Sequence, residues 1–377
     1  SAYGILSTFS SKLNQVESGK WYEQLGEWDK ALDIYEKQAN TDISTLIQCY
    51  GHLQLWDNIK SFSNKYEKMS QEEKDLNSLW FAWAEYHTGN LDKVKHYMNP
   101  NANDLPNILF RIIYSIASGD YNLASKTIEL GFKKLSEQTE VFNGSDTNQA
   151  SNTMVYAQNL VELKEALKMK QENATTIPQI WQNRLKNFSH ESDAWIKLID
   201  IRCLVLRPED HIASYIKMIS VLRAERKWKL VDVYYSRFLS SIKTPDTVLT
   251  NLKNHWARDS KQFAISFLSA FNKLLGATSE EKVEHIIQKC PQHKSRLIEI
   301  FDFSEETPKI QSIKHYIQKN MVNDETTSRL LRIQAEWEYH LYSGQTSPVT
   351  KLIKISKLFE RANSLVPNDY RTWGGWA

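Results

Sequence analysis

The sequence has few of the residues that interrupt helices. Its 377 residues include only 12 glycines and 9 prolines. Sheet-rich proteins need many tight turns, and nucleotide-binding loops need clustered glycines, so this composition argues against both classes. Long helices joined by short turns are compatible with it.

Cysteine is scarce as well. The three cysteines, Cys49, Cys203 and Cys290, lie far apart and form no C-x-x-C pair. A sparse, odd-numbered set is typical of a reducing compartment and does not suggest a disulfide framework. We therefore expect three buried free thiols.

Neither an excess of charge nor a long hydrophobic run is present. The formal net charge is +2, from 47 basic and 45 acidic residues, so nothing attracts the whole chain to nucleic acid or anionic lipid. The aromatic residues are not interleaved with basic ones in the pattern of a single-strand binding groove, so we expect no nucleic-acid partner. No run of about 18 apolar residues occurs, so we expect no transmembrane segment.

Recognisable catalytic and metal-binding motifs are missing. The sequence contains no glycine-rich phosphate loop, no H-E-x-x-H, no EF-hand loop and no G-x-S-x-G. Residues 302–304 (D-F-S) resemble a kinase D-F-G, and Cys290 lies close to His293, but neither pattern has the partner residues that its chemistry requires. We interpret both as helix ends, and we expect no catalytic residue and no metal ligand in this chain.

One helical segment carries alternating charges. It contains Glu162 and Glu165 together with Lys164, Lys168 and Lys170. Charges spaced three and four residues apart lie on one helix face and can pair there. We interpret this face as solvated surface.

A repeat of about thirty residues runs through the first third of the chain. In each copy a short turn, often with a glycine, precedes a large apolar residue and then a segment of helical periodicity. Equivalent positions are held by Trp28, Trp56, Leu91 and Tyr121, at intervals of 28, 35 and 30 residues. Residues 226–234 are a further copy, which begins around Trp228.

This period is that of a helix–turn–helix unit and is close to that of a tetratricopeptide repeat (TPR). One hairpin cannot bury its own apolar face, so neighbouring hairpins must stack. The sequence therefore predicts an all-α fold, an α-solenoid of stacked TPR-like and HEAT-like helical hairpins.

The polar stretch 136–152 contains Asn-Gly and is predicted to be a loop between repeats. It divides the chain into N-terminal TPR-like repeats, residues 1–150, and C-terminal helical repeats, residues 151–377. The sequence assigns no repeats within residues 276–325.

Five strings of residues resemble the FAT region of target-of-rapamycin (TOR) kinases, which belong to the phosphatidylinositol-3-kinase-related kinase superfamily. The family patterns include W-Y-E-K-L-x-E-W near the start, I-W-x-x-R-L followed by W-x-K-[IL] and R-s-L-V-[IVL]-x-P, then M-K-N-x-W-K and W-Y-K-A-W. The matching strings, in the same order, are residues 21–32, 180–185, 195–210, 252–258 and 370–377. The block from I-W-Q-N-R-L to R-P-E-D favours TOR over other kinases with FAT repeats.

The resemblance implies a non-catalytic region of a Ser/Thr protein kinase that controls cell growth in response to nutrients. In that family the region forms a clamp around the kinase domain of the same polypeptide and contacts TOR complex subunits within a large dimeric assembly. The rapamycin-binding and kinase segments, with ATP and Mg, would follow the end of this chain. The implied location is cytoplasmic, with peripheral attachment to vacuolar, lysosomal or other endomembranes. The alternative is a free-standing TPR-type adaptor that binds peptide tails.

The resemblance also implies one ligand. The family clamp holds an inositol polyphosphate in a basic pocket, and the lysine of its W-Y-K-A-W string corresponds to Arg371, which keeps the positive charge. A second family lysine falls at Ile333, although Arg332 is adjacent. The implied site is therefore an inositol hexakisphosphate contact at Arg371, and the alternative is an exposed arginine on a terminal helix.

Overall fold

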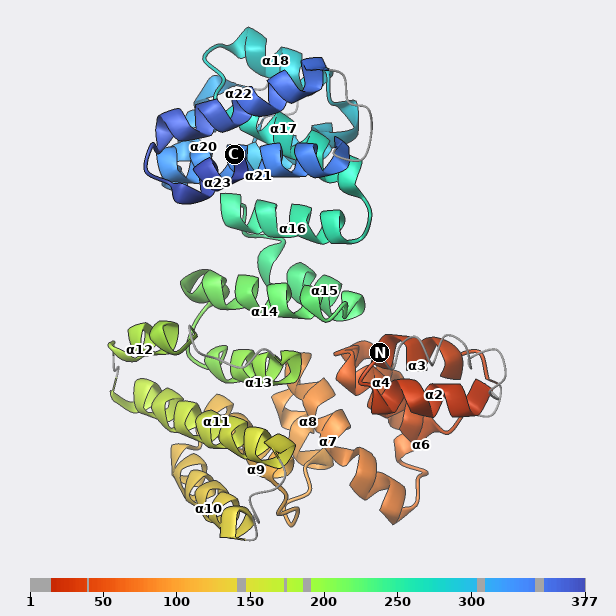
Figure 1. Cartoon of the computed structure of the whole chain (residues 1–377). Coiled ribbons are helices and arrows are strands. Elements are labelled where there is room, and N and C mark those ends of the chain that lie inside the picture. Colours follow the sequence, from red (N-terminus) through yellow and green to blue (C-terminus); the bar gives the residue numbers. More distant parts are fainter. Residues whose placement is uncertain are drawn as a thin grey trace. The chain divides into compact units, whose positions relative to one another are not determined.

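The computed structural model describes residues 15–38, 41–140, 147–172, 175–185, 191–303, 309–342 and 349–376. Within these ranges the regular structure is entirely helical (Figure 1), which confirms the all-α prediction. The helices form two compact units, Ser1–Tyr234 and Tyr235–Ala377, called here the N-terminal and C-terminal units. None of the helices in the described ranges has the length and apolar character needed to traverse a bilayer.

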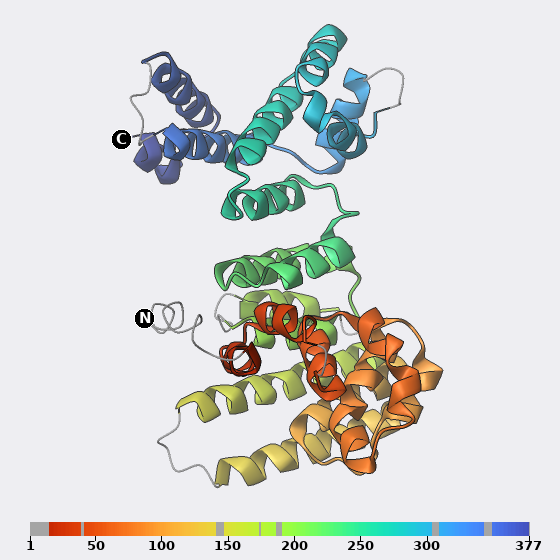
Figure 2. The same ribbon diagram turned by 90° about the vertical axis from the view of Figure 1, so that its right-hand side faces the viewer.

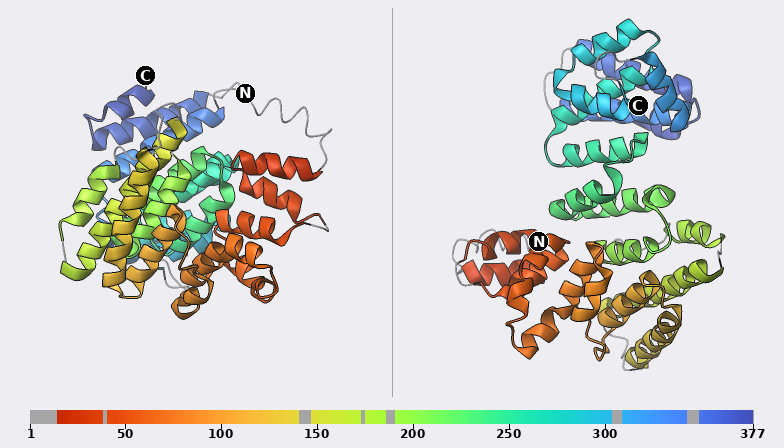
Figure 3. Two further views of the ribbon diagram at one scale, coloured as in Figure 1. Left: turned by 90° about the horizontal axis from the view of Figure 1, so that it is seen from below. Right: turned by 180° about the vertical axis from the view of Figure 1, so that it is seen from behind.

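In the N-terminal unit, helices that follow one another along the chain pack side by side. α9, α10 and α11 contact one another, and α11, α13 and α14 succeed one another as layers (Figures 2 and 3). This serial stacking of hairpins is the predicted solenoid. The helices are α2 (Gln15–Gln24), α3 (Trp28–Tyr35), α4 (Ile43–His52), α5 (Trp56–Ser61), α6 (Ser63–Tyr66), α7 (Gln71–His87), α8 (Leu91–Tyr97), α9 (Leu105–Ala117), α10 (Tyr121–Glu140), α11 (Thr147–Glu172), α12 (Ile177–Arg184), α13 (Ser192–Arg202), η2 (Pro208–His211), α14 (Ile212–Ala224) and α15 (Trp228–Tyr234).

The turns of the repeat share one backbone geometry. Gly26, Gly89 and Gly119 have φ values of 69°, 81° and 82°, in the left-handed region that glycine adopts without steric cost. Gln54 and Arg226 occupy the same place in their copies, each with a φ of 59°. After each of these five residues, the next amide donates to the carbonyl five residues earlier, at 2.8–3.0 Å. This is the Schellman ending of a helix.

The large apolar residue predicted after each turn begins the second helix of its hairpin. Trp28, Trp56, Leu91, Tyr121 and Trp228 are the first residues of α3, α5, α8, α10 and α15. The predicted repeat positions are therefore confirmed, including their register within the hairpin.

The predicted loop at residues 136–152 is wrong at both of its ends. Residues 136–140 belong to α10 and residues 147–152 belong to α11, while residues 141–146 lie outside the described residues. Residues 150 and 151 lie within α11. The division into two kinds of repeat at that point stays a prediction.

The C-terminal unit contains the segment 276–325 that the sequence left unassigned. Apart from residues 304–308, which are not described, this segment folds into three short helices and a 3₁₀ turn between α17 and α21. The elements are the π-helical turn η3 (Tyr235–Leu239), α16 (Pro245–Ala257), α17 (Lys261–Leu275), α18 (Glu280–Gln288), the 3₁₀ turn η4 (Pro291–His293), α19 (Lys294–Phe301), α20 (Ile310–Lys319), α21 (Asp324–Tyr342), α22 (Val349–Leu365) and α23 (Tyr370–Trp376).

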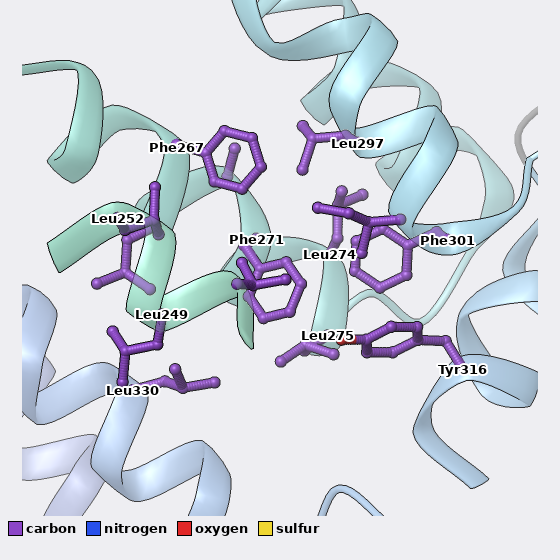
Figure 4. Packing of buried hydrophobic residues seen from close by; sticks show 14 of the residues in the cluster. Leu249, Leu252, Phe267, Phe271, Leu274, Leu275, Leu297, Phe301, Tyr316 and Leu330 are labelled. Atoms are coloured by element: carbon purple, nitrogen blue, oxygen red, sulfur yellow. The ribbon is translucent and has the colours of Figure 1, made fainter. Parts of the chain in front are cut away.

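α17 is the central helix of this unit, in contact with α16, α18, α20 and α21. Its Phe271 is fully buried, with ring centroids 5.4 Å from Phe301 and 6.1 Å from Tyr316 (Figure 4). The short helices look polar because each contributes only a few apolar side chains to this core. Burying each such side chain stabilises the fold by about 1.5–3 kcal/mol, enough to hold a short helix in place.

Candidate functional site

Two of the strings that resemble the TOR family meet in a buried group of charges in the N-terminal unit. α11 supplies Glu162 and Glu165, α12 supplies Trp181 and Arg184, and α13 supplies Arg202. We call these five residues the charge cluster. Trp181 and Arg184 belong to the I-W-Q-N-R-L string, and Arg202 belongs to the string that ends in R-P-E-D.

Arg202 and Glu162 form the inner half of the charge cluster. Their side chains are 1% and 0% exposed. Arg202 donates from Nε to Glu162 Oε2 at 3.0 Å and from Nη2 to Oε1 at 3.1 Å, which is a bidentate pair. Further donations reach the Trp181 carbonyl at 3.2 Å and the Ser214 hydroxyl at 3.3 Å. A buried ion pair is tolerated when its donors are satisfied in this way.

Arg184 and Glu165 form the outer half. Arg184 donates two hydrogen bonds to the Glu165 carboxylate, at 2.6 and 2.7 Å, and the Trp181 indole donates a third at 2.7 Å. Burial alone would raise the pKa of Glu165, but the hydrogen bonds from Arg184 and Trp181 outweigh it and hold the pKa below its ordinary value. The carboxylate therefore remains charged and keeps α11 and α12 joined.

The interpretation of this α11 face as solvated surface was wrong for its two glutamates. Glu162 is buried and Glu165 is partly buried, whereas the three lysines, Lys164, Lys168 and Lys170, are exposed as expected. The opposite charges lie 19 and 40 residues further along the chain. Spacing within one helix gives no sign of partners at such separations.

Arg371, the one site residue that the sequence proposed, lies in α23 of the C-terminal unit. Its side chain is exposed, and its Nε donates to the Tyr370 hydroxyl at 3.1 Å. Arg332 of α21 donates to Glu336 at 2.6 Å and has its Nε 3.9 Å from Asp369. Arg332 is thus compensated by carboxylates, whereas the guanidinium of Arg371 is accessible to a ligand.

Ile333, at the place of the second family lysine, is 7% exposed and packs in the core. A charged side chain at this position would be costly to bury. The departure from the family pattern is therefore part of the packing of α21.

The two patterns that resembled catalytic motifs are helix ends, as interpreted. Asp302 ends α19 in the left-handed conformation, with a φ of 53°, and Phe303 is buried. His293 is 1% exposed, with its Nε2 2.8 Å from the Ser266 hydroxyl and its ring edge-on to Phe263.

The cysteines match the expectation only in part. Cys49 is buried, but Cys203 is exposed and Cys290 is intermediate. None of the three forms a disulfide bond in the part of the chain that the structure describes. Among the residues that the structure describes, no group of His, Cys, Asp and Glu has the geometry of a metal site.

Comparison with known proteins identifies the region to which the strings belong. The sequence-family model of the FAT domain matches residues 52–377 of this chain. The chain belongs to the FAT domain family. The charge cluster and Arg371 both lie within residues 52–377, the part of the chain that matches the FAT domain.

Its relatives are TOR kinases. The chain is 28% identical to the serine/threonine-protein kinase tor1 of Schizosaccharomyces pombe over 68% of its own length, and 23% identical to the serine/threonine-protein kinase mTor of Drosophila melanogaster over 100%. TOR2 of Saccharomyces cerevisiae is 24% identical over 79% of the chain. These alignments cover 12%, 15% and 13% of the three relatives.

The assignment of the chain to the FAT region of TOR kinases, which the five strings suggested, is therefore confirmed. The chain corresponds to the FAT region of these TOR proteins and not to their kinase domain. The string at residues 21–32 precedes the FAT match but lies within the alignment to the Drosophila relative.

Proposed function

We propose that this chain is a non-catalytic scaffold within a TOR-like Ser/Thr protein kinase that controls cell growth in response to nutrients. The scaffold would hold the kinase domain of the same polypeptide and bind partner subunits of a large dimeric complex, in the cytoplasm and on endomembranes. The observation that carries this proposal is the match of the FAT domain over residues 52–377. The relatives bear the name of Ser/Thr protein kinases, and the chain covers only a small part of their length.

The architecture suits a scaffold. Stacked hairpins expose a large surface, and each hairpin contacts mainly its neighbours, so the array can bind several partners and transmit small changes of curvature. In the N-terminal unit the charge cluster fixes α11, α12 and α13 to one another through five side-chain hydrogen bonds from Arg184, Arg202 and Trp181 to the two glutamates. We therefore expect this part of the array to keep its shape when a partner binds.

Immunoprecipitation from the source cells tests the proposal. An antibody against this chain should precipitate a polypeptide several times larger than 43.9 kDa that phosphorylates serine or threonine in a protein substrate. The activity should disappear when an ATP-competitive inhibitor is added. A precipitated polypeptide of about the size of this chain, without kinase activity, would instead support the free-standing TPR-type adaptor.

We further propose that Arg371 contacts inositol hexakisphosphate, as the family resemblance implies. Removing one charge-assisted contact to a phosphate should lower the affinity about tenfold or more. Calorimetric titration of the 377-residue chain should therefore show at least that loss for Arg371→Ala.

Lys319→Ala is the matched control, because Lys319 is an exposed cation on α20 of the same unit. The Lys319→Ala variant should bind inositol hexakisphosphate with the same affinity as the unmodified chain. Arg371 would be excluded from the ligand site if Arg371→Ala bound inositol hexakisphosphate as tightly as the unmodified chain. It would also be excluded if neither of these two proteins bound the ligand.

A further inference from the structure

A cleft of about 500 Å³ opens in the N-terminal unit between α4, α5, α7, α9 and α13. Its volume is within the range of pockets that enclose a small ligand or a few side chains of a peptide. The cleft is made by residues from four segments of the sequence, and no motif marked it. We call it the acidic aromatic cleft, because indole rings and carboxylates dominate its lining.

The apolar wall of the cleft is built around Trp80 of α7. Gly51 of α4 lies directly against this indole, and a Cβ at Gly51 would collide with the ring. The absence of a side chain at this helical glycine therefore lets Trp80 lie close to α4. Trp83 and Leu76 also line the cleft, and Leu76 is 56% exposed. An apolar wall that includes an exposed leucine favours an apolar ligand group.

The polar part of the lining is strongly acidic. Asp75, Asp104, Asp193 and Asp200 line the cleft, against a single cation, Lys197. The Lys197 ammonium lies 4.8 Å from the centroid of the Tyr156 ring. The Asp193 side chain is 66% exposed, although Lys227 lies 3.6 Å away.

His52, the one histidine in the lining, does not offset this charge. Its ring stacks on Trp28 with centroids 3.8 Å apart and lies 5.0 Å from Trp80. Burial lowers the pKa of His52 to about 4, so the ring is neutral near pH 7. The cleft therefore combines an aromatic wall with an excess of three negative charges among its lining residues.

We propose that the acidic aromatic cleft binds a segment of a partner protein that carries arginine or lysine beside a bulky apolar residue. The apolar side chain would pack on Trp80, Trp83 and Leu76, and the cation would pair with the carboxylates of Asp104 and Asp193. A cation above an exposed indole face is attracted by the ring as well. An acidic segment would meet the same carboxylates without compensation.

The proposed cleft ligand rests on the proposed scaffold function in one respect. We take the bound segment to belong to a subunit of the same kinase complex. Binding of a peptide to the 377-residue chain needs no kinase domain. A failure of the peptide experiment would therefore leave the proposed kinase association, which the immunoprecipitation tests, unaffected.

Two synthetic peptides serve as probes. One is acetyl-Gly-Leu-Arg-Leu-Leu-Arg-Gly-amide, and the other has glutamate in place of both arginines. Titration of the 377-residue chain, followed by tryptophan fluorescence and calorimetry, should show binding of the arginine peptide at least about tenfold tighter than that of the glutamate peptide. The affinity should fall as salt is raised from about 0.05 M to about 0.5 M, because the carboxylates are screened.

Variants locate the binding. The double variant Asp104→Asn, Asp193→Asn should weaken the arginine peptide about fivefold or more, since each lost charge contact contributes on this scale. Asparagine at position 104 can still cap α9, where Asp104 now accepts from the Asn107 amide at 3.0 Å. Asp92→Asn, an exposed carboxylate on α8 outside the cleft lining, is the matched control and should leave the affinity unchanged.

Leu76→Ser tests the apolar wall and should weaken the arginine peptide without affecting the helical circular dichroism, because Leu76 is mostly exposed. The proposal is overturned if both peptides bind equally, or if neither binds at about 1 mM. It is equally overturned if the Asp104, Asp193 double variant binds the arginine peptide as tightly as the Asp92 control.

Discussion

Replacing Arg202 with alanine should destabilise the N-terminal unit by about 3–5 kcal/mol, because the Glu162 carboxylate would remain buried without its partner. Both side chains are almost completely inaccessible. Without Arg202, the Glu162 carboxylate would keep only the Gln158 amide at 3.4 Å and Arg184 at 3.8 Å. The Trp181 carbonyl and the Ser214 hydroxyl would lose a donor as well. Urea unfolding followed by circular dichroism measures the loss as a lower midpoint.

Two comparisons separate the charge from the packing. The double variant Glu162→Leu, Arg202→Met removes both charges and roughly conserves volume, so it should be clearly more stable than Arg202→Ala. Lys168→Ala, an exposed change on the same helix α11, should shift stability by no more than about 0.5 kcal/mol. A cost below about 1 kcal/mol for Arg202→Ala would mean that the ion pair contributes nothing beyond the contacts of its aliphatic portion.

Acidification from pH 7 to pH 4 should also weaken the N-terminal unit, through His52 and His211. Burial is the largest cause that lowers the pKa of both to about 4, from an ordinary value of 6.5. In the folded chain they are neutral, whereas in the unfolded chain they take up protons below pH 6.5. Stability is therefore fully present above pH 6.5 and is lost as the pH falls toward 4, by about 3 kcal/mol for each histidine.

The environment of His211 explains the direction. The residue is 3% exposed, and neither ring nitrogen has a hydrogen-bond partner among the described residues. Its ring lies 4.6 Å from the Tyr215 ring, and the neighbouring Arg202 charge further disfavours protonation. Protonation would place a second cation beside a buried guanidinium.

Urea unfolding at intervals between pH 7 and pH 4 measures this effect. His211→Leu should reduce the slope of stability against pH in that window, since the variant has one fewer group that protonates on unfolding. His285→Gln, a change of an exposed histidine on α18 of the other unit, should leave the slope unchanged. The prediction is wrong if stability is flat across the window, or if His211→Leu and His285→Gln give the same slope.

The repeat positions could be predicted because the signal is local. A Schellman turn is formed by about six consecutive residues, so a glycine followed by a large apolar residue specifies both the end of one helix and the start of the next. Gly89 and Leu91 are an example, and the structure has them in that arrangement. Gln54 and Arg226 adopt the same left-handed conformation without glycine, because the residues around them repeat the rest of the pattern.

The amino-acid sequence by itself determined the all-α repeat, its register and the resemblance to the FAT region of TOR kinases. Only the tertiary structure decided that Glu162 and Glu165 are buried against Arg202 and Arg184, since these partners are 40 and 19 residues away. Only the tertiary structure assembled the acidic aromatic cleft, whose lining comes from α4, α5, α7, α9 and α13 and the turns beside them. The physical reason is one of range: hydrogen bonds and periodicity within a hairpin are set by neighbours in sequence, whereas burial and charge pairing depend on which hairpins stack.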